Sequence, residues 1–461
     1  MYNWQVMASA VAGSPIRTSL RRFVASPSVR WGLVLFLLAL GLRLAWLSIV
    51  SPGPLLDGWF FYYSAESIAS GGGFINPFNG APTASLPPGY AFLLSGLFVT
   101  FGADPLVAKV FNVVAGAVTV VLVYALATRL AGQRAGIVAG VVLALFPSQI
   151  FFPVMIMTEA LFAGLLVGLV LLLVIWLSKG SMKTWQVFVL GLLLGAMSLV
   201  RAETIFLLPS LIVLWLVLRL RWQAVAQHGL ILAVGMAILI TPWTIRNYVR
   251  FEEFIPIRGG QGAPLRGARI ALSMDYDSPR YTIVGGRQEP APLDQLIADH
   301  LRHPWQLADL GARKIADMFG RDYAFAWIDL CNGNPNSPFV QTACSQDQAP
   351  LSGNGYEPPG GVAPWAAIGD AYYYAVGLTV LLGVPVLLAK GDRRYLIIAW
   401  FIASWCLIHL IYVPQPRYHF PVLPMVSLFA GIVLVEIWDR VKHRLRPPQR
   451  KPQLSEAVDA N

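Results

Sequence analysis

Ten runs of apolar residues, most of them long enough to cross a lipid bilayer, divide this chain of 461 residues. A helix needs about 20 apolar residues to span the hydrocarbon core. Charged side chains make up only 13% of the chain, whereas a soluble domain has about 25%. The sequence therefore predicts an all-α polytopic membrane protein, and it excludes a disordered chain, a disulfide scaffold and an average soluble enzyme. The predicted spans are residues 31–50, 104–128, 135–152, 159–178, 185–200, 204–218, 226–245, 366–389, 395–413 and 418–438.

The Lys and Arg residues predict the direction in which the chain crosses the membrane. With the N-terminus inside, every predicted inner loop is basic, and these loops and the two tails hold more than half of the 34 basic residues. The net charge of +10 therefore follows topology and does not indicate a nucleic acid-binding face. An eleventh apolar stretch, Pro88 to Phe101, would break this pattern if it crossed the bilayer. We expect it to lie in the interface or to re-enter the membrane.

The large outer loop carries two further signals. Its amphipathic stretch, Pro292 to Phe319, has apolar residues near helical spacing, and we expect His303-Pro304 to split it into two helices. Cys331 and Cys344 lie 13 residues apart on the oxidising side, which favours a disulfide over two unpaired thiols.

The inner loops are too short for a nucleotide-binding domain, and the chain has no Walker A loop and no dinucleotide fingerprint. Chemistry is therefore expected outside or at the outer leaflet. A lipid-linked substrate fits that side better than a cytosolic nucleotide sugar.

Two carboxylates stand at apolar boundaries on the outer side, where an unpaired charge is costly. Asp57 follows the first span and precedes an aromatic cluster, Trp59 to Tyr63, that could stack on a sugar ring. Glu159 opens the fourth span. The pair could serve as base and orienting group or could hold a divalent metal ion, so the metal requirement stays open. The alternative is that each carboxylate caps a helix.

Basic residues also gather at the outer boundary, where the charge rule disfavours them. A phosphate or pyrophosphate group is the obvious ligand. The alternative is snorkelling, or an ion pair such as Arg201 with Glu203. The candidate substrate-binding residues are Lys109, Arg201, Glu203, Arg246, Arg417 and His419, with Tyr62 and Tyr63 packing against sugar or carrier. The six histidines show no metal spacing, and His409 is expected to be a core residue.

These motifs, in this order, resemble the GT-C glycosyltransferases, and most closely the bacterial family 39 proteins related to protein O-mannosyltransferases and the lipid A aminoarabinose transferase. The residues that carry the resemblance are Asp57 after the first span, PPGY at 87–90, Glu159, RAETIFLLP at 201–209, TPWTIRNY at 241–248 and RYHFPVLP at 417–424. The resemblance covers about residues 31–440.

The resemblance implies sugar transfer from a polyprenyl-phosphate carrier to a lipid, glycan or protein acceptor on the outer face of the bacterial inner membrane. Asp57 matches the presumed catalytic carboxylate, and Glu159 matches the second-loop acidic position. Two departures stand out. Gly58 replaces a second acidic residue, which weakens a metal site, and Leu86 replaces a lysine, which leaves phosphate binding to other residues.

The expected architecture is a GT-C-like bundle of about ten transmembrane helices with interfacial helices in the first outer loop and a small outer domain in a late loop. Two other functions stay open: an O-antigen ligase or polymerase, and a lipid-linked sugar transporter. Both termini are expected inside. The predicted parts are an inner tail (1–30), a transmembrane catalytic module (31–249) with its first outer loop (51–103), a large outer loop domain (250–365), C-terminal membrane helices (366–440) and a basic inner tail (441–461).

Overall fold

The structure, a computed structural model, describes residues 26–259 except 51–52, 55–56 and 181. In the outer loop it describes residues 281–284, 287–290, 298, 301–320 and 322, and towards the C-terminus residues 363–411 and 416–445. The predicted disulfide cysteines, Cys331 and Cys344, lie outside the described residues.

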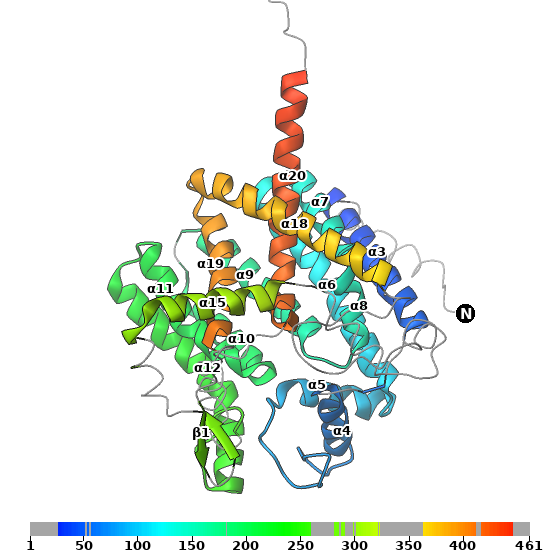
Figure 1. The fold of residues 1–461 in the computed structure, drawn as a ribbon, viewed down its shortest axis with the longest axis vertical. Helices are drawn as coiled ribbons and strands as arrows, with labels where there is room; N and C mark the ends of the chain where they lie inside the picture. The colour runs from blue at the N-terminus through cyan, green and yellow to red at the C-terminus, as the bar shows by residue number, and fades with distance from the viewer. Residues whose placement is uncertain are drawn as a thin grey trace, which may run out of the picture.

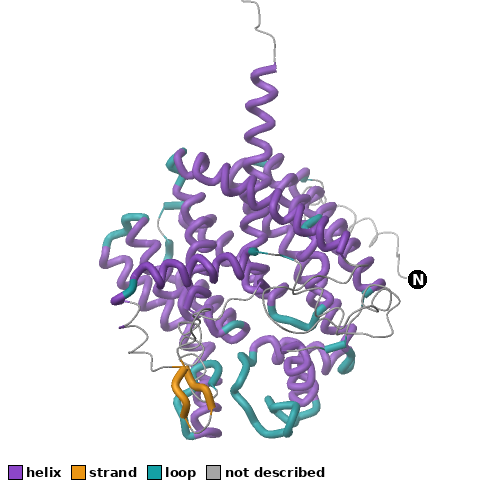
Figure 2. The backbone as a smooth tube through the Cα atoms, viewed as in Figure 1, coloured by secondary structure: helices purple, strands orange, loops and turns teal. Residues whose placement is uncertain are grey.

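Helices dominate the described chain (Figure 2). Six of them are long and apolar enough to cross a membrane. A seventh candidate is a bent pair, α7 (Gln133–Ala144) with α8 (Pro147–Phe151) and the 3-10 helix η1 (Phe152–Val154), which turns by 67°. The six are α3 (Pro27–Ile49), α6 (Pro105–Ala131), α9 (Glu159–Leu177), α12 (Trp222–Phe251), α18 (Ala363–Ala389) and α20 (Leu423–Leu445).

Shorter helices fill the remaining predicted spans. In the predicted spans 185–200 and 204–218 the structure has α10 (Thr184–Val200) and α11 (Leu207–Val217), which is preceded by the 3-10 helix η2 (Ala202–Phe206). At about 1.5 Å per residue these helices are shorter than the roughly 30 Å hydrocarbon core. The many-helix bundle is confirmed, and the number ten stays a prediction. The predicted span 395–413 corresponds to α19 (Arg393–Ile411), and Pro88–Phe101 forms the 13-residue α5 (Gly89–Phe101).

Local signals in the sequence fix where several helices begin. The Ser26 side chain accepts a hydrogen bond from the Val29 N–H, and Asp104 does the same for Leu106, each before a proline in the first turn. The predicted split at His303 is confirmed, because the backbone of His303 is not helical (φ −125°, ψ 65°) and α15 (Pro304–Phe319) begins at the next residue. The helix α20 continues to Leu445, beyond residue 440, and the predicted boundary between the membrane helices and the tail stays a prediction.

The first predicted outer loop lies at one end of the bundle, where α4 (Asp57–Ala69) and α5 form one lobe (Figure 1). The late predicted loop contributes the antiparallel hairpin of β1 (Tyr281–Val284) and β2 (Arg287–Pro290), drawn towards the same end, whereas α15 crosses the middle of the bundle in this view. The free end of α20 points to the opposite side. The largest hydrophobic core includes residues of α6, α9 and α20. The apolar stretches of these three helices are more buried than those of the other three candidate spans.

Candidate active site

A polar cavity of about 200 Å³ lies where the ends of several helices meet, on the side that the basic loops predict to be outside. Six of its lining side chains are charged, three acidic and three basic, and they come from five separate chain segments. Five of the six were predicted from the sequence. The charged lining residues are Asp57, Glu159, Arg201, Glu203, Arg258 and Arg417, and Phe61, Leu86, Pro87, Met157, Thr158, Val200 and Tyr418 complete the wall.

Asp57 begins α4 and pairs with Arg417 of the 3-10 helix η3 (Pro416–Val422). Arg417 Nη2 lies 3.0 Å from Asp57 Oδ2. The Asp57 side chain is 42% exposed, whereas that of Arg417 is 12% exposed. Asp57 is therefore open to a molecule that enters the cavity, while Arg417 is fixed behind it against the Tyr418 ring.

Glu159 and Arg201 form a second, buried ion pair. Arg201 Nη1 lies 3.1 Å from Glu159 Oε1, and both side chains are less than a tenth exposed. Thr158 donates from its hydroxyl to the other Glu159 oxygen. Arg201 also packs over the rings of Phe162, Trp405 and Tyr418, and its Nε has no hydrogen-bond partner among the described residues. The alternative partner considered from the sequence was Glu203, but the ion pair in the structure is with Glu159.

Gly58 allows α4 to approach the segment that leads to Glu159. A Cβ atom at position 58 would lie 2.5 Å from the carbonyl oxygen of Ile156, which is far inside van der Waals contact. An acidic side chain at this position has no room. The close contact at Gly58 therefore explains why this chain lacks the second acidic residue of the family pattern. The same contact places Asp57 next to residues 157–159.

Buried polar contacts also fix the segment that contains Met155 and Met157 and leads to Glu159. Asn112 of α6 donates to the carbonyl oxygens of Met155 and Met157, and the Tyr90 hydroxyl donates to Asn112. Tyr90 belongs to the PPGY motif, whose Gly89 abuts the backbone of Leu199 near the end of α10. The motif thus joins the first outer loop to both halves of the cavity.

The motif TPWTIRNY, near the end of α12, fixes the chain immediately after it. Beyond a left-handed residue at Glu252, residues 252–259, which we call the return segment, fold back along α12. Trp243, Thr244 and Asn247 donate from their side chains to the carbonyl oxygens of Ile257, Pro256 and Ile255, respectively.

The return segment brings Arg258 into the cavity, and sequence reasoning missed this residue. The apolar stretch before Arg258, Phe254 to Ile257, is far too short to cross a membrane, so the cost of a charge at a membrane boundary could not point to this residue. The next residue, Gly259, donates its backbone N–H to the Ala84 carbonyl in the first outer loop at 2.8 Å. The two outer segments therefore meet at the edge of the cavity.

Two predicted basic residues serve the frame around the cavity and do not line it. Arg246 donates to the carbonyl oxygens of Thr83 and Phe74, so it clamps the first outer loop onto α12. His419 contacts the Met318 carbonyl oxygen through Nδ1, and its Nε2 lies 2.8 Å from Asp322 Oδ1 in the outer loop.

Three further predicted residues also lie outside the cavity lining. Lys109 is buried on α6. The Tyr62 hydroxyl donates to the Ala103 carbonyl, and burial raises the pKa of Tyr62 to about 12. Tyr63 is partly exposed and packs on Trp59 and Tyr62.

The donor set of the cavity does not fit a metal ion. Two of its three carboxylates already contact arginine, and no three His, Cys, Asp or Glu side chains gather in the part of the chain that the structure describes. Hard divalent cations prefer several oxygen ligands without competing cations. We therefore derive no step through a metal.

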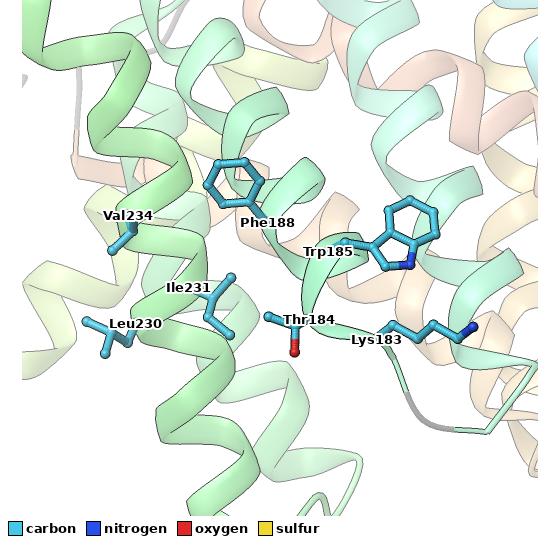
Figure 3. A pocket seen from close by; sticks show the side chains of 7 residues that line it. All are labelled: Lys183, Thr184, Trp185, Phe188, Leu230, Ile231 and Val234. Carbon is cyan, nitrogen blue, oxygen red and sulfur yellow. The ribbon is translucent and has the colours of Figure 1, made fainter.

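Two apolar grooves also occur on the described surface. One of about 720 Å³, between the start of α10 and α12, is shown in Figure 3 with Lys183 as its only charged lining residue. The other, of about 570 Å³, lies between α11, α12 and the return segment. Neither gathers chemistry-bearing side chains.

The comparisons with known proteins agree with this architecture. Residues 85–245 match the family model described as dolichyl-phosphate-mannose-protein mannosyltransferase. Comparison with curated proteins gave no match. The chain has the fold of the GT-C glycosyltransferases, as the resemblance in sequence predicted.

Two solved proteins illustrate the likeness. ArnT from Cupriavidus metallidurans in the apo state is 16% identical, with a TM-score of 0.54 over 91% of this chain, and the structure bound to undecaprenyl phosphate is 17% identical, with a TM-score of 0.54 over 90%. The archaeal oligosaccharyltransferase AglB from Archaeoglobus fulgidus, in complex with an inhibitory peptide and a dolichol-phosphate, is 13% identical, with a TM-score of 0.56 over 90%. This chain spans 62% of the length of ArnT and 51% of that of AglB.

Proposed function

We propose that this protein is a membrane glycosyltransferase that moves a sugar from a polyprenyl-phosphate carrier to an acceptor hydroxyl. The observation that supports it most is the cavity, which combines an accessible carboxylate with three arginines at one end of an apolar helix bundle. Arginine forks bind phosphate oxygens, and an anionic carrier would account for three such residues beside a membrane boundary. ArnT from Cupriavidus metallidurans, which has the same fold, has been solved bound to undecaprenyl phosphate.

The proposed reaction is a direct displacement at the anomeric carbon. Asp57 takes the proton of the acceptor hydroxyl as that oxygen bonds to the anomeric carbon. The bond from this carbon to the phosphate oxygen breaks, and the carrier leaves as polyprenyl phosphate. Because the leaving group is already a phosphate, its charge needs stabilisation more than it needs a proton. Arg201, Arg258 and Arg417 provide positive charge around the space that it would occupy.

The Asp57–Arg417 pair suits this step in a further way. The adjacent guanidinium of Arg417 orients the Asp57 carboxylate before the acceptor arrives. The Asp57 side chain is partly exposed, which leaves room for the acceptor on the side that faces away from Arg417. The reaction is placed on the outer face of the inner membrane, with both termini inside, because the basic loops favour that orientation.

The test uses purified protein in detergent and a panel of undecaprenyl-phosphate-linked hexoses and pentoses. Release of undecaprenyl phosphate with transfer of the sugar supports the proposal, and a deletion strain should accumulate one undecaprenyl-phosphate sugar by mass spectrometry. Glu66→Gln is a matched control, since Glu66 lies on α4 with Asp57 but does not line the cavity. Absence of transfer from every donor, with no accumulated lipid, would refute the enzyme.

A further inference from the structure

Glu203 differs from the other two carboxylates of the cavity. Asp57 and Glu159 each contact an arginine at 3.0 and 3.1 Å, respectively. The carboxylate of Glu203 lines the same cavity, but it makes no ion pair or hydrogen bond to another residue of the described chain within ordinary distances. Its own backbone N–H and the charges of Arg201 and Arg258 stabilise this carboxylate, but no side chain of the described residues donates a hydrogen bond to it.

A carboxylate in a confined cavity has several acceptor positions, and those of Glu203 that no other residue fills are available to a donor on the substrate. The phosphate of the carrier cannot supply such a donor, since a phosphate dianion or diester offers only acceptor oxygens and repels a carboxylate. A prenyl chain has no donor either. The hydroxyl groups of the sugar are the part of a polyprenyl-phosphate sugar that can donate to Glu203.

The backbone around Glu203 is held firmly enough to select a geometry. Glu203 lies in η2 between two residues that both contact the carbonyl oxygen of Met197. Arg201 donates its backbone N–H to that oxygen at 2.8 Å, and the buried Thr204 donates its hydroxyl at 3.4 Å. A short, anchored turn limits the positions that the carboxylate can reach, which is what recognition of one hydroxyl requires.

We infer that Glu203 accepts a hydrogen bond from a hydroxyl group of the donor sugar and thereby selects which sugar is transferred. The inference rests on the proposed function, because it assigns the sugar end of the same cavity. The arginines then mark the phosphate end, and Asp57 lies where the acceptor enters. In this arrangement the basic side chains bind the phosphate and the acidic side chain of Glu203 binds the sugar.

The experiment measures how strongly the enzyme discriminates against sugars that lack one hydroxyl. The substrates are the undecaprenyl-phosphate sugar that supports transfer among the hexoses and pentoses tested, and its monodeoxy analogues. Wild-type protein, Glu203→Ala, Glu203→Gln and the control Glu66→Gln are compared by kcat/KM. A hydrogen bond to a charged acceptor corresponds to a loss of roughly 10- to 150-fold. We expect that loss for at least one deoxy analogue with the wild type and with the control.

The variants should remove that discrimination at one hydroxyl only. In Glu203→Ala the parent sugar and that analogue should differ by less than about threefold, and the other analogues should keep their wild-type ratios. Glu203→Gln retains an acceptor oxygen without the charge, so its ratio should fall between the two. It also provides the measurement if the alanine variant does not fold.

Two results would overturn the inference. One is wild-type discrimination against every deoxy analogue in both Glu203 variants, which would leave Glu203 as a distant counter-charge for Arg258. The other is wild-type protein that accepts all the deoxy analogues as well as the parent sugar. A wild type that transfers no sugar from any donor is a different result, because it refutes the proposed function itself.

Discussion

Replacing Gly58 by alanine should move Asp57, the proposed general base, without changing its chemical groups. The new Cβ would lie 2.5 Å from the Ile156 carbonyl oxygen, whereas carbon–oxygen contacts normally begin at about 3.3 Å. The start of α4 or the segment at Ile156 must therefore shift by roughly 0.8 Å, which is the difference between these two distances. Asp57 is the neighbouring residue, so the shift is transmitted to it directly.

A misplacement of about 1 Å can cost roughly 10²-fold in rate, and overpacking costs about 1–3 kcal/mol of stability. We expect Gly58→Ala to lower kcat/KM for transfer by about 10²-fold and to lower the thermal midpoint in detergent. Gly96→Ala is the matched control, because a Cβ at position 96 of α5 meets nothing within 4 Å. That variant should keep full activity and unfold no earlier, since alanine favours helix over glycine by about 0.5–1 kcal/mol. Wild-type kinetics in Gly58→Ala would refute the role given to this contact.

Other changes test the cavity and the orientation separately. Asp57→Asn keeps the shape and removes the basicity, so transfer should fall by roughly 10²–10⁴-fold at unchanged expression; near-normal transfer would rule out the base. Arg201→Gln alone leaves Glu159 buried without its ion-pair partner and should lower the free energy of unfolding by about 3–5 kcal/mol. The double variant Arg201→Gln with Glu159→Gln should recover folding but bind undecaprenyl phosphate poorly. Wild-type affinity in the double variant would make Arg201 purely structural. Arg258→Gln should weaken binding of undecaprenyl phosphate in a titration without loss of thermal stability, and an unchanged affinity contradicts its assignment to the phosphate. An exposed thiol introduced as Ser70→Cys, in a background without the native cysteines, should react with an impermeant reagent in intact cells; reaction only after permeabilisation would reverse the predicted orientation.

The helices were predictable because apolar length is a local property, whereas the ends and bends of those helices were not. The predicted span 135–152 is broken near Pro147, where proline removes a backbone donor and the chain turns by 67°. Pro147 was visible in the sequence. Whether a proline kinks a span or breaks it depends on the neighbours that accept the bend, and these belong to tertiary structure.

The cost of a charge at an apolar boundary identified Asp57, Glu159, Arg201 and Arg417, and the structure brings all four into one cavity. Their roles stay predictions. The same criterion also selected Arg246, which uses its charge to hold loop carbonyl oxygens. Burial cost therefore locates charged residues that need partners, but it cannot say whether the partner is a substrate or the protein itself.

Arg258 shows the complementary failure. Nothing in its neighbouring sequence marks it, because its position depends on three hydrogen bonds from α12 to backbone carbonyl oxygens of the return segment. In hydrogen bonds of this kind the return segment contributes only backbone carbonyl oxygens, which every residue type has. Its amino-acid sequence therefore need not show that the bonds exist. A residue delivered in this way is found only when the fold is known.

The attachment of Gly259 to Ala84 has a consequence for how such proteins can diversify. The chain enters its large outer loop directly after a residue whose backbone is tied to the first outer loop and whose predecessor lines the cavity. Insertions or deletions between residues 260 and 280 need not disturb the cavity, since the chain before them is tied at Gly259 and the later part of the loop is held separately through His419. That stretch can then vary in length between relatives, and a chimera that exchanges only residues 260–280 should retain the donor preference of this protein.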